Sequence, residues 1–206
     1  MSPTHPSEGY LKFTCHRSPG AIGIPDELFD SLNHWRRVMR QKELIGIYPD
    51  GIGYGNISVR ILGSNHFCIS GTATGGLEDL NIEHYALVER CDPDLNTVWC
   101  RGQINASAES MSHAAIYNTI PWSAAVVHIH NRPLWDKYLN LLPTTSTEVE
   151  YGTPAMAAEI TRILSLPETL QQKIIIMGGH EEGIISFGQT LEEATSLILA
   201  LDGIPS

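Results

Sequence analysis

Two histidines close a short apolar run past the midpoint of the chain. Residues 124–127 are Ala, Ala, Val and Val, and His128, Ile129 and His130 follow them. On a strand, side chains two positions apart point to the same face. We therefore expect His128 and His130 to project side by side while Ile129 enters the opposite layer. Such a pair could bind zinc, nickel, cobalt, copper or iron, or be two structural histidines held by hydrogen bonds.

A third histidine follows a second apolar run. Residues 173–177 lead into Gly178, Gly179 and His180. Glycine allows the backbone to turn sharply at a strand end, so we expect His180 to reach toward the first pair. Three histidines on one divalent ion leave coordination positions open for water or substrate, as in catalytic zinc sites. The alternative is that His180 lies in a solvent-exposed turn.

An acidic residue lies in the first turn of a helix predicted at residues 107–118. Ser107 is a suitable N-cap for this helix, and Glu109 follows two residues later. A carboxylate in this place can interact with the helix dipole, or it can act as a general acid and base beside a metal. His113 shares the helix face of Glu109. We interpret His113 as a packing residue or an outer partner of the ligands rather than as a ligand.

The elements that must position these residues follow from hydrophobic spacing, glycines and capping residues. The sequence predicts strands at residues 10–15, 57–61, 66–70, 98–100, 124–130 and 173–177. It predicts helices at residues 26–45, 79–88, 107–118, 153–164 and from the capping box of Thr190 and Glu193 to residue 201. We interpret residues 1–25, which are rich in Pro, Gly and Ser, as an arm, and residues 26–206 as a single mixed α/β domain.

Composition and charge narrow the class of protein. The formal net charge of −10 argues against a nucleic-acid partner and against binding to anionic membranes. The sequence contains no apolar run of about 18 residues or more, and its start lacks the pattern of a secretory signal. We therefore expect a cytoplasmic protein. No two of the four cysteines have C-x-x-C spacing, which favours reduced thiols; they are Cys15, Cys68, Cys91 and Cys100.

Four fragments in a fixed order resemble the class II aldolase/adducin family, over roughly residues 28–200. They are Gly55-Asn-Ile-Ser-Val-Arg60; Ser107-Ala-Glu109 with His113-Ala-Ala-Ile-Tyr117; Val126-Val-His-Ile-His130; and Ile174-Ile-Ile-Met-Gly-Gly-His180 with residues 187–194. The family includes fuculose-phosphate and rhamnulose-phosphate aldolases, ribulose-phosphate 4-epimerase and methylthioribulose-phosphate dehydratase. The resemblance implies a central, mainly antiparallel sheet with helices on both faces, and a homotetramer with active sites between subunits.

The resemblance also implies roles for individual residues. Three histidines would be the zinc ligands: His128, His130 and His180. Glu109 would be the catalytic acid and base. Three further residues match positions near the phosphate of the substrate: Asn56, Thr72 and Ser107.

The sequence departs from the family pattern in four places. Ala108 replaces a serine in the phosphate loop, and Ala73 replaces a glycine in the loop after the first hairpin. The segment between His130 and Tyr151, which normally carries a catalytic tyrosine toward a neighbouring subunit, is much shorter. The fragment His180-Glu-Glu-Gly183 contains two more residues than the usual His-Gly.

These observations lead to an expected function. We expect a lyase of carbohydrate metabolism that acts on a small hydroxy-ketone or sugar, phosphorylated or not, through a metal-stabilised enediolate. Glu109 would move the proton. The alternatives are an epimerase or a dehydratase of the same family, or an adducin-like interaction module without a metal. A barrel hydrolase with an H-x-H motif is disfavoured, because such barrels need about 250 residues and carry the motif early in the chain.

Overall fold

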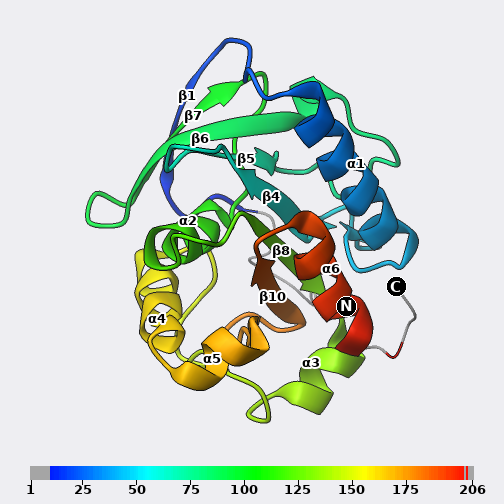
Figure 1. The fold of residues 1–206 in the computed structure, drawn as a ribbon, viewed down its shortest axis with the longest axis vertical. Coiled ribbons are helices and arrows are strands. Elements are labelled where there is room, and N and C mark those ends of the chain that lie inside the picture. Colours follow the sequence, from blue (N-terminus) through cyan, green and yellow to red (C-terminus); the bar gives the residue numbers. More distant parts are fainter. Residues whose placement is uncertain (1–9, 202, 204–206) are drawn as a thin grey trace.

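The computed structural model describes residues 10–201 and residue 203. Its centre is an eight-stranded sheet with the order β1-β7-β6-β5-β4-β8-β10-β9 (Figure 1). The strands are β1 (Thr14–Ser18), β4 (Asn56–Arg60), β5 (Phe67–Ser70), β6 (Tyr85–Asp92), β7 (Thr97–Gly102), β8 (Ala125–His130), β9 (Ile174–Ile176) and β10 (Gly183–Gly188). All neighbouring strands are antiparallel except β1 and β7, which are parallel. The predicted mainly antiparallel α/β sheet is confirmed.

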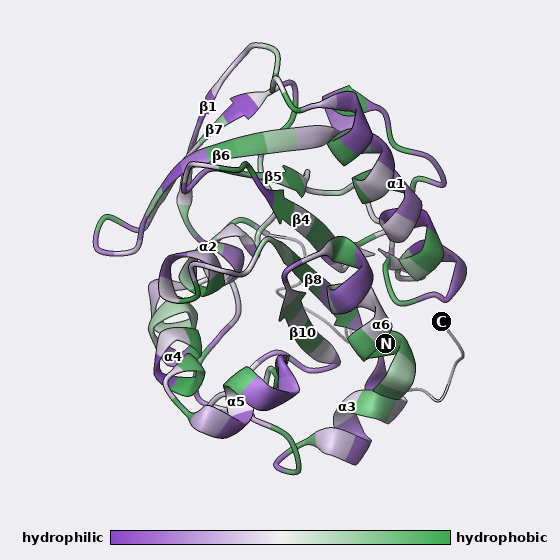
Figure 2. Ribbon diagram, in the orientation of Figure 1, coloured by the Kyte–Doolittle hydropathy of each residue, from purple (hydrophilic) through white to green (hydrophobic). Residues whose placement is uncertain are grey.

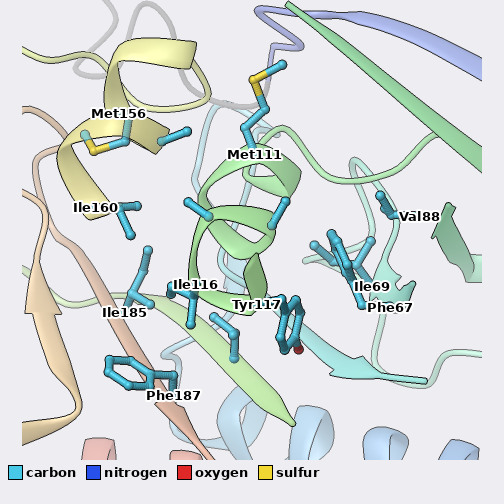
Figure 3. Close-up of a cluster of buried hydrophobic side chains, with 14 of the residues drawn as sticks. Phe67, Ile69, Val88, Met111, Ile116, Tyr117, Met156, Ile160, Ile185 and Phe187 are labelled. Carbon is cyan, nitrogen blue, oxygen red and sulfur yellow. The ribbon is translucent and has the colours of Figure 1, made fainter. Parts of the chain in front are cut away.

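Helices cover both faces of this sheet, and each face has its own hydrophobic cluster. On one face lie α1 (Asp26–Gln41), α3 (Arg132–Tyr138) and α6 (Leu191–Leu201); on the other lie α2 (Ser110–Thr119) and α4 (Pro154–Leu164), with α5 (Pro167–Gln172) after α4. Figure 2 shows hydrophobic residues along β8 and β10 between the two layers. In the cluster under α2 and α4, Ile116, Ile160 and Ile185 come together from α2, α4 and β10 (Figure 3).

Strand β8 carries two of the candidate ligands, and its side chains alternate between the two clusters. Val126 belongs to the cluster under α2 and α4, whereas Val127 and Ile129 belong to the cluster under α1 and α6. Because alternate residues of a strand share a face, His128 and His130 lie on the side of Val126. The prediction that Ile129 faces the opposite layer is therefore confirmed.

A second, two-stranded sheet lies beside the main one. It pairs β2 (Gly46–Ile47) with β3 (Gly53–Tyr54) in antiparallel register. We refer to residues 46–54 as the small hairpin, because it carries two tyrosines that reach the candidate site.

The helix predicted at residues 79–88 is wrong. The segment forms a short 3-10 helix, Ile82–His84, and then enters β6, Tyr85–Asp92. The first half of this strand, Tyr85–Val88, is buried on both faces because helices cover both sides of the sheet, so the usual polar alternation is absent there. Its side chains belong to both hydrophobic clusters: Tyr85 and Leu87 pack on one face, and Ala86 and Val88 pack on the other.

The helix predicted from Ser107 begins three residues later, at Ser110, and Glu109 takes the N-cap position. Ser107 forms a turn before it, in which its Oγ accepts a hydrogen bond from the Glu109 amide at 3.3 Å. The prediction of Ser107 as the N-cap is therefore wrong. As a consequence, Ser107 and Glu109 lie in the approach to the helix, where their side chains meet the sheet end that carries the histidines.

Several smaller predictions can be compared with the structure. The caps Thr153 and Thr190 accept hydrogen bonds from the amides of Met156 and Glu193, as expected. The strand predicted at residues 10–15 lies at β1 instead, and residues 1–9 of the predicted arm lie outside the described residues. The four cysteines are free thiols. Within the part of the chain that the structure describes, no helix has the length and apolar character needed to cross a membrane.

Candidate metal centre

Three buried histidines converge at one end of β8. His128 and His130 come from the strand, and His180 comes from the turn between β9 and β10. One nitrogen of each ring lies within 4.8 Å of the chosen nitrogens of the other two. The ring centroids are 4.7 to 5.1 Å apart. The structure therefore brings the three predicted ligands together.

The chemistry of this cluster fits a divalent transition metal. Burial and the two neighbouring imidazoles hold the pKa of His128 well below its usual range, so its ring is neutral, as a metal ligand must be. The Nε2 atom of His128 is buried and has no hydrogen-bond partner among the described residues. A buried polar atom without a partner is costly. A shared cation would satisfy it, and a set of three imidazoles suits zinc or another late transition metal.

Two glycines bring His180 into position, although for a different reason from the predicted one. Neither Gly178 nor Gly179 has a positive φ. Instead, the backbone of residues 145–149 passes so close that a Cβ on Gly178 would lie 2.2 Å from the Thr145 carbonyl oxygen. A Cβ on Gly179 would lie 2.0 Å from the Val149 carbonyl oxygen. The glycines are therefore required by close packing, not by a left-handed turn.

The outer nitrogens of two ligands have identified partners. The Asn56 side-chain amide lies 3.2 Å from Nδ1 of His128, and the Tyr48 hydroxyl lies 2.7 Å from Nδ1 of His130. If His128 binds a metal through Nε2, its Nδ1 carries the proton. The side-chain oxygen of Asn56 accepts that proton in a hydrogen bond when the amide group is rotated by 180°. Asn56, which the resemblance assigns to the substrate, is thus in contact with a ligand.

Glu109 lies beside the histidines and is 2 % exposed. Its Oε2 accepts a hydrogen bond of 2.6 Å from the Ser112 hydroxyl, one turn further along α2. Its Oε1 lies 3.7 Å from Nδ1 of His180. One carboxylate oxygen is held by the helix while the other is directed at the cluster, which suits a group that moves a proton at this site.

The predicted substrate residues share one pocket with Glu109. Asn56, Thr72 and Ser107 line it, together with glycines of the 71–75 loop and Tyr151. Ala73, in this loop, has a φ of 59° in the left-handed region. Such a conformation costs an L-residue roughly 1–2 kcal/mol, which explains why glycine is the more usual residue there.

His113 is not one of the three converging histidines. Its Nδ1 is 2.7 Å from the Ser58 hydroxyl, which in turn lies 2.7 Å from the Tyr117 hydroxyl. Complete burial lowers the pKa of His113 to about 3, so the ring is neutral. The interpretation of His113 as a packing residue rather than a ligand agrees with this geometry.

Sequence reasoning missed three residues at the site. Tyr48 contacts His130, and the Tyr151 ring stacks on His180 with centroids 4.3 Å apart. The third is Arg36 on α1, which is 1 % exposed and donates hydrogen bonds to the carbonyls of Thr74, Gly75 and Glu78. Only Arg36 left a sequence signal, because it lies four residues after Leu32 and three before Met39, on the buried face of its helix.

A larger cavity lies elsewhere, between the segment at residues 20–24 and the start of α1. Its volume is about 490 Å³, against about 30 Å³ for the pocket beside Glu109. Its lining contains the carboxyl groups of Asp26 and Glu83 but no histidine or cysteine among the described residues. The smaller pocket is the candidate site, because Asn56 and Glu109 in its lining lie against His128 and His180.

Solved structures with a similar fold include sugar-phosphate aldolases. L-fuculose 1-phosphate aldolase matches with a TM-score of 0.67 and 16 % identity, over 89 % of this chain and 85 % of that chain. The enzyme of the same name from Thermus thermophilus matches with a TM-score of 0.62 and 20 % identity, over 87 % of this chain and 91 % of that chain. A sugar-phosphate aldolase from Thermotoga maritima matches with a TM-score of 0.64 and 14 % identity, over 86 % of this chain and 91 % of that chain. At these identities the likeness establishes the fold.

The sequence itself matches a family profile. A search of curated protein sequences found no match. The profile of the class II aldolase and adducin N-terminal domain matches residues 50–204, which include all three histidines and Glu109. This match spans most of the chain and agrees with the fold. The chain therefore belongs to the class II aldolase and adducin family.

Proposed function

We propose that this protein is a metal-dependent lyase of the aldolase type, acting on a small hydroxy-ketone or sugar. The observation that carries the proposal is the distance of 3.7 Å between Oε1 of Glu109 and Nδ1 of His180. It brings a carboxylate to the edge of a cluster of three imidazoles inside one buried site. Family membership supports the same reading.

His128, His130 and His180 would hold the ion, with zinc as the first choice. A divalent ion bound there would supply Lewis-acid stabilisation of negative charge on substrate oxygens. Glu109 accepts a proton from the substrate and returns it, while the Ser112 hydroxyl at 2.6 Å keeps its carboxylate in one orientation. Burial of Glu109 excludes bulk water from that transfer.

The pocket also bears on the class of substrate. Among the described residues, its lining contains no lysine or arginine. Its donors are the hydroxyls of Thr72 and Ser107, the amide of Asn56 and the backbone of the glycine-rich loop. Neutral donors of this kind bind sugar hydroxyls as well as phosphate oxygens. A substrate screen therefore needs hydroxy-ketones both with and without a phosphate group.

The test combines metal analysis with turnover. Purified protein should contain about one equivalent of a divalent metal per chain, and removing the metal should abolish cleavage of a substrate from the screen. Glu109→Gln should keep the fold and the metal while lowering turnover by at least about 10²-fold. Glu192→Gln, at an exposed acid in the first turn of α6, is the matched control and should leave turnover unchanged. Full activity of Glu109→Gln would contradict the proposed role.

Product analysis separates the related reactions. A lyase gives two carbonyl fragments, an epimerase gives a stereoisomer of the substrate, and a dehydratase gives a product lighter by one water. An adducin-like interaction module would contain no metal and turn over none of the substrates. We also propose a cytoplasmic homotetramer, on the analogy of the family. Light scattering that shows a stable monomer at micromolar concentration would contradict the tetramer.

A further inference from the structure

The turn between β9 and β10 contains the two residues that the family pattern lacks, Glu181 and Glu182. The Glu182 carbonyl accepts a hydrogen bond of 3.0 Å from the amide of Asn131, next to His130. Glu182 has a φ of 69°, in the left-handed region. A glutamate in this conformation costs roughly 1–2 kcal/mol, and such strain gathers at functional sites. The question is what the strained residue does.

Hydrogen bonding connects Glu182 to a metal-ligand candidate through one tyrosine. The Tyr48 hydroxyl donates to Oε2 of Glu182 at 2.7 Å. The same hydroxyl oxygen lies 2.7 Å from Nδ1 of His130. A phenol has a single proton and a carboxylate only accepts, so the proton between Tyr48 and His130 belongs to the imidazole. His130 is therefore held as the tautomer with a proton on Nδ1, and its Nε2 lone pair faces the cluster.

The small hairpin fixes the plane of the same ring. The Tyr54 ring stacks on His130, with centroids 5.6 Å apart and planes inclined by 28°. The Tyr48 and Tyr54 rings are 4.5 Å apart. One tyrosine therefore sets the tautomer of His130 and the other limits its rotation. Partners of this kind orient ligands in metal sites and raise their affinity for the ion.

We propose that Tyr48 and Glu182 are positioning residues that hold His130 in the tautomer required for binding a divalent metal. This inference rests on the metal site of the proposed function. It assigns a purpose to the inserted residue Glu182 and to the small hairpin, neither of which contributes a ligand. The strain at Glu182 is maintained because its carboxylate anchors the Tyr48 proton.

The first test measures zinc affinity by competition with a chromophoric chelator. Tyr48→Phe should weaken zinc binding by about 10–100-fold, the usual effect of losing an outer partner of a ligand. Tyr138→Phe is the matched control, because its hydroxyl donates to the Leu201 carbonyl at 3.3 Å rather than contacting a candidate ligand, and its zinc affinity should equal that of the wild type. Equal zinc affinity of Tyr48→Phe and Tyr138→Phe would overturn the proposal.

A second pair of variants tests the carboxylate. Glu182→Gly keeps the left-handed backbone accessible and removes the acceptor of the Tyr48 proton, so zinc affinity should fall. Glu181→Gly removes one negative charge from the same turn, where Glu181 pairs with Arg132 at 3.4 Å, and should have little effect. Equal losses in the two variants would mean that charge, not positioning, attracts the metal, and the proposal would be wrong.

Nitrogen-15 NMR of the histidine side chains separates this proposal from the metal site itself. In metal-free wild-type protein, His130 should be the tautomer protonated at Nδ1, and Tyr48→Phe should populate the tautomer protonated at Nε2. If the wild type shows this tautomer and yet binds no metal, the proposed function fails while the positioning pair stands. A wild-type His130 protonated at Nε2 would overturn the positioning role directly.

Discussion

His113 and the cluster of His128, His130 and His180 are buried on the same side of the sheet, and they differ in whether other imidazoles converge on them. Nδ1 of His113 contacts the hydroxyl of Ser58, which also contacts Tyr117. Nδ1 of His128 contacts the Asn56 amide, and Nε2 of both His113 and His128 is buried without a hydrogen-bond partner among the described residues. The difference is that one nitrogen each of His128, His130 and His180 lie within 4.8 Å of one another, a cluster to which His113 does not belong.

The difference separates a structural histidine from a candidate ligand. A single buried neutral imidazole is tolerated with one hydrogen bond, as His113 has with Ser58. Three neutral imidazoles that point at a common centre gain little from one another, and a proton on any of them would repel the next. A cation at the centre resolves both problems. Burial and an unpartnered nitrogen therefore do not identify the candidate ligands; the convergence of three rings does.

The largest expected effect is the loss of zinc affinity when one of the three clustered histidines is removed. His128→Ala should weaken zinc binding by more than about 10²-fold, because losing a ligand exceeds the loss of about 10–100-fold from an outer partner. His113→Asn keeps a polar group near Ser58 and should leave zinc affinity unchanged. Competition with a chelator measures both. A loss of affinity in His113→Asn equal to that in His128→Ala would remove the distinction between the two groups.

The shared face of His128 and His130 could be predicted from the sequence because strand β8 obeys a local rule. In β8 the alternation of side chains fixes His128 and His130 on one face whatever the rest of the chain does. In β6 the same rule gave no signal, since Tyr85 and Val88 are both buried in opposite layers and the segment was predicted as a helix. Periodicity alone fails for a strand that is buried on both faces; β8 is such a strand too, and it was predicted from its continuous apolar run.

The contacts around the ligands were beyond sequence reasoning for a different reason. Tyr48 and Glu182 are 134 positions apart and meet only because the small hairpin folds over the turn before β10. Gly178 and Gly179 were correctly singled out, but their close packing against residues 145–149 depends on a segment with no periodic pattern. Local chemistry is thus readable from spacing, whereas the residues that orient it are set by long-range packing.

The second prediction concerns how the stability of the fold depends on pH through His113. In the folded protein the pKa of His113 is about 3, against 6.5 for an unperturbed histidine. Because the folded pKa is depressed, the unfolded chain binds the proton first as pH falls. The stability that His113 contributes is therefore fully present above pH 6.5 and is lost as the pH falls from 6.5 to 3. Over this range the free energy of unfolding falls by about 1.4 kcal/mol per pH unit, or about 2 kcal/mol from pH 6.5 to pH 5.

Urea unfolding of metal-free protein at several pH values measures this slope. His128 has a depressed pKa as well and adds to the loss over part of the same range. His113→Asn carries no titrating ring, so its slope should be shallower than that of the wild type by up to about 1.4 kcal/mol per pH unit. An unchanged slope in this variant would mean that His113 is already protonated in the fold, and its structural assignment would be wrong.

The smallest expected effect uses the same substitution on both sides of the comparison. Tyr117→Phe removes the hydroxyl that lies 2.7 Å from the Ser58 hydroxyl and keeps the buried ring. It should lower the free energy of unfolding by about 1 kcal/mol, the net worth of a typical hydrogen bond, without changing zinc affinity. Tyr48→Phe removes a hydroxyl from the histidine cluster and should instead weaken zinc binding. Urea unfolding of metal-free protein and chelator competition on both variants give the four numbers needed. If Tyr117→Phe weakened zinc binding as much as Tyr48→Phe, the two groups of histidines would be one coupled network rather than a structural histidine beside a metal site.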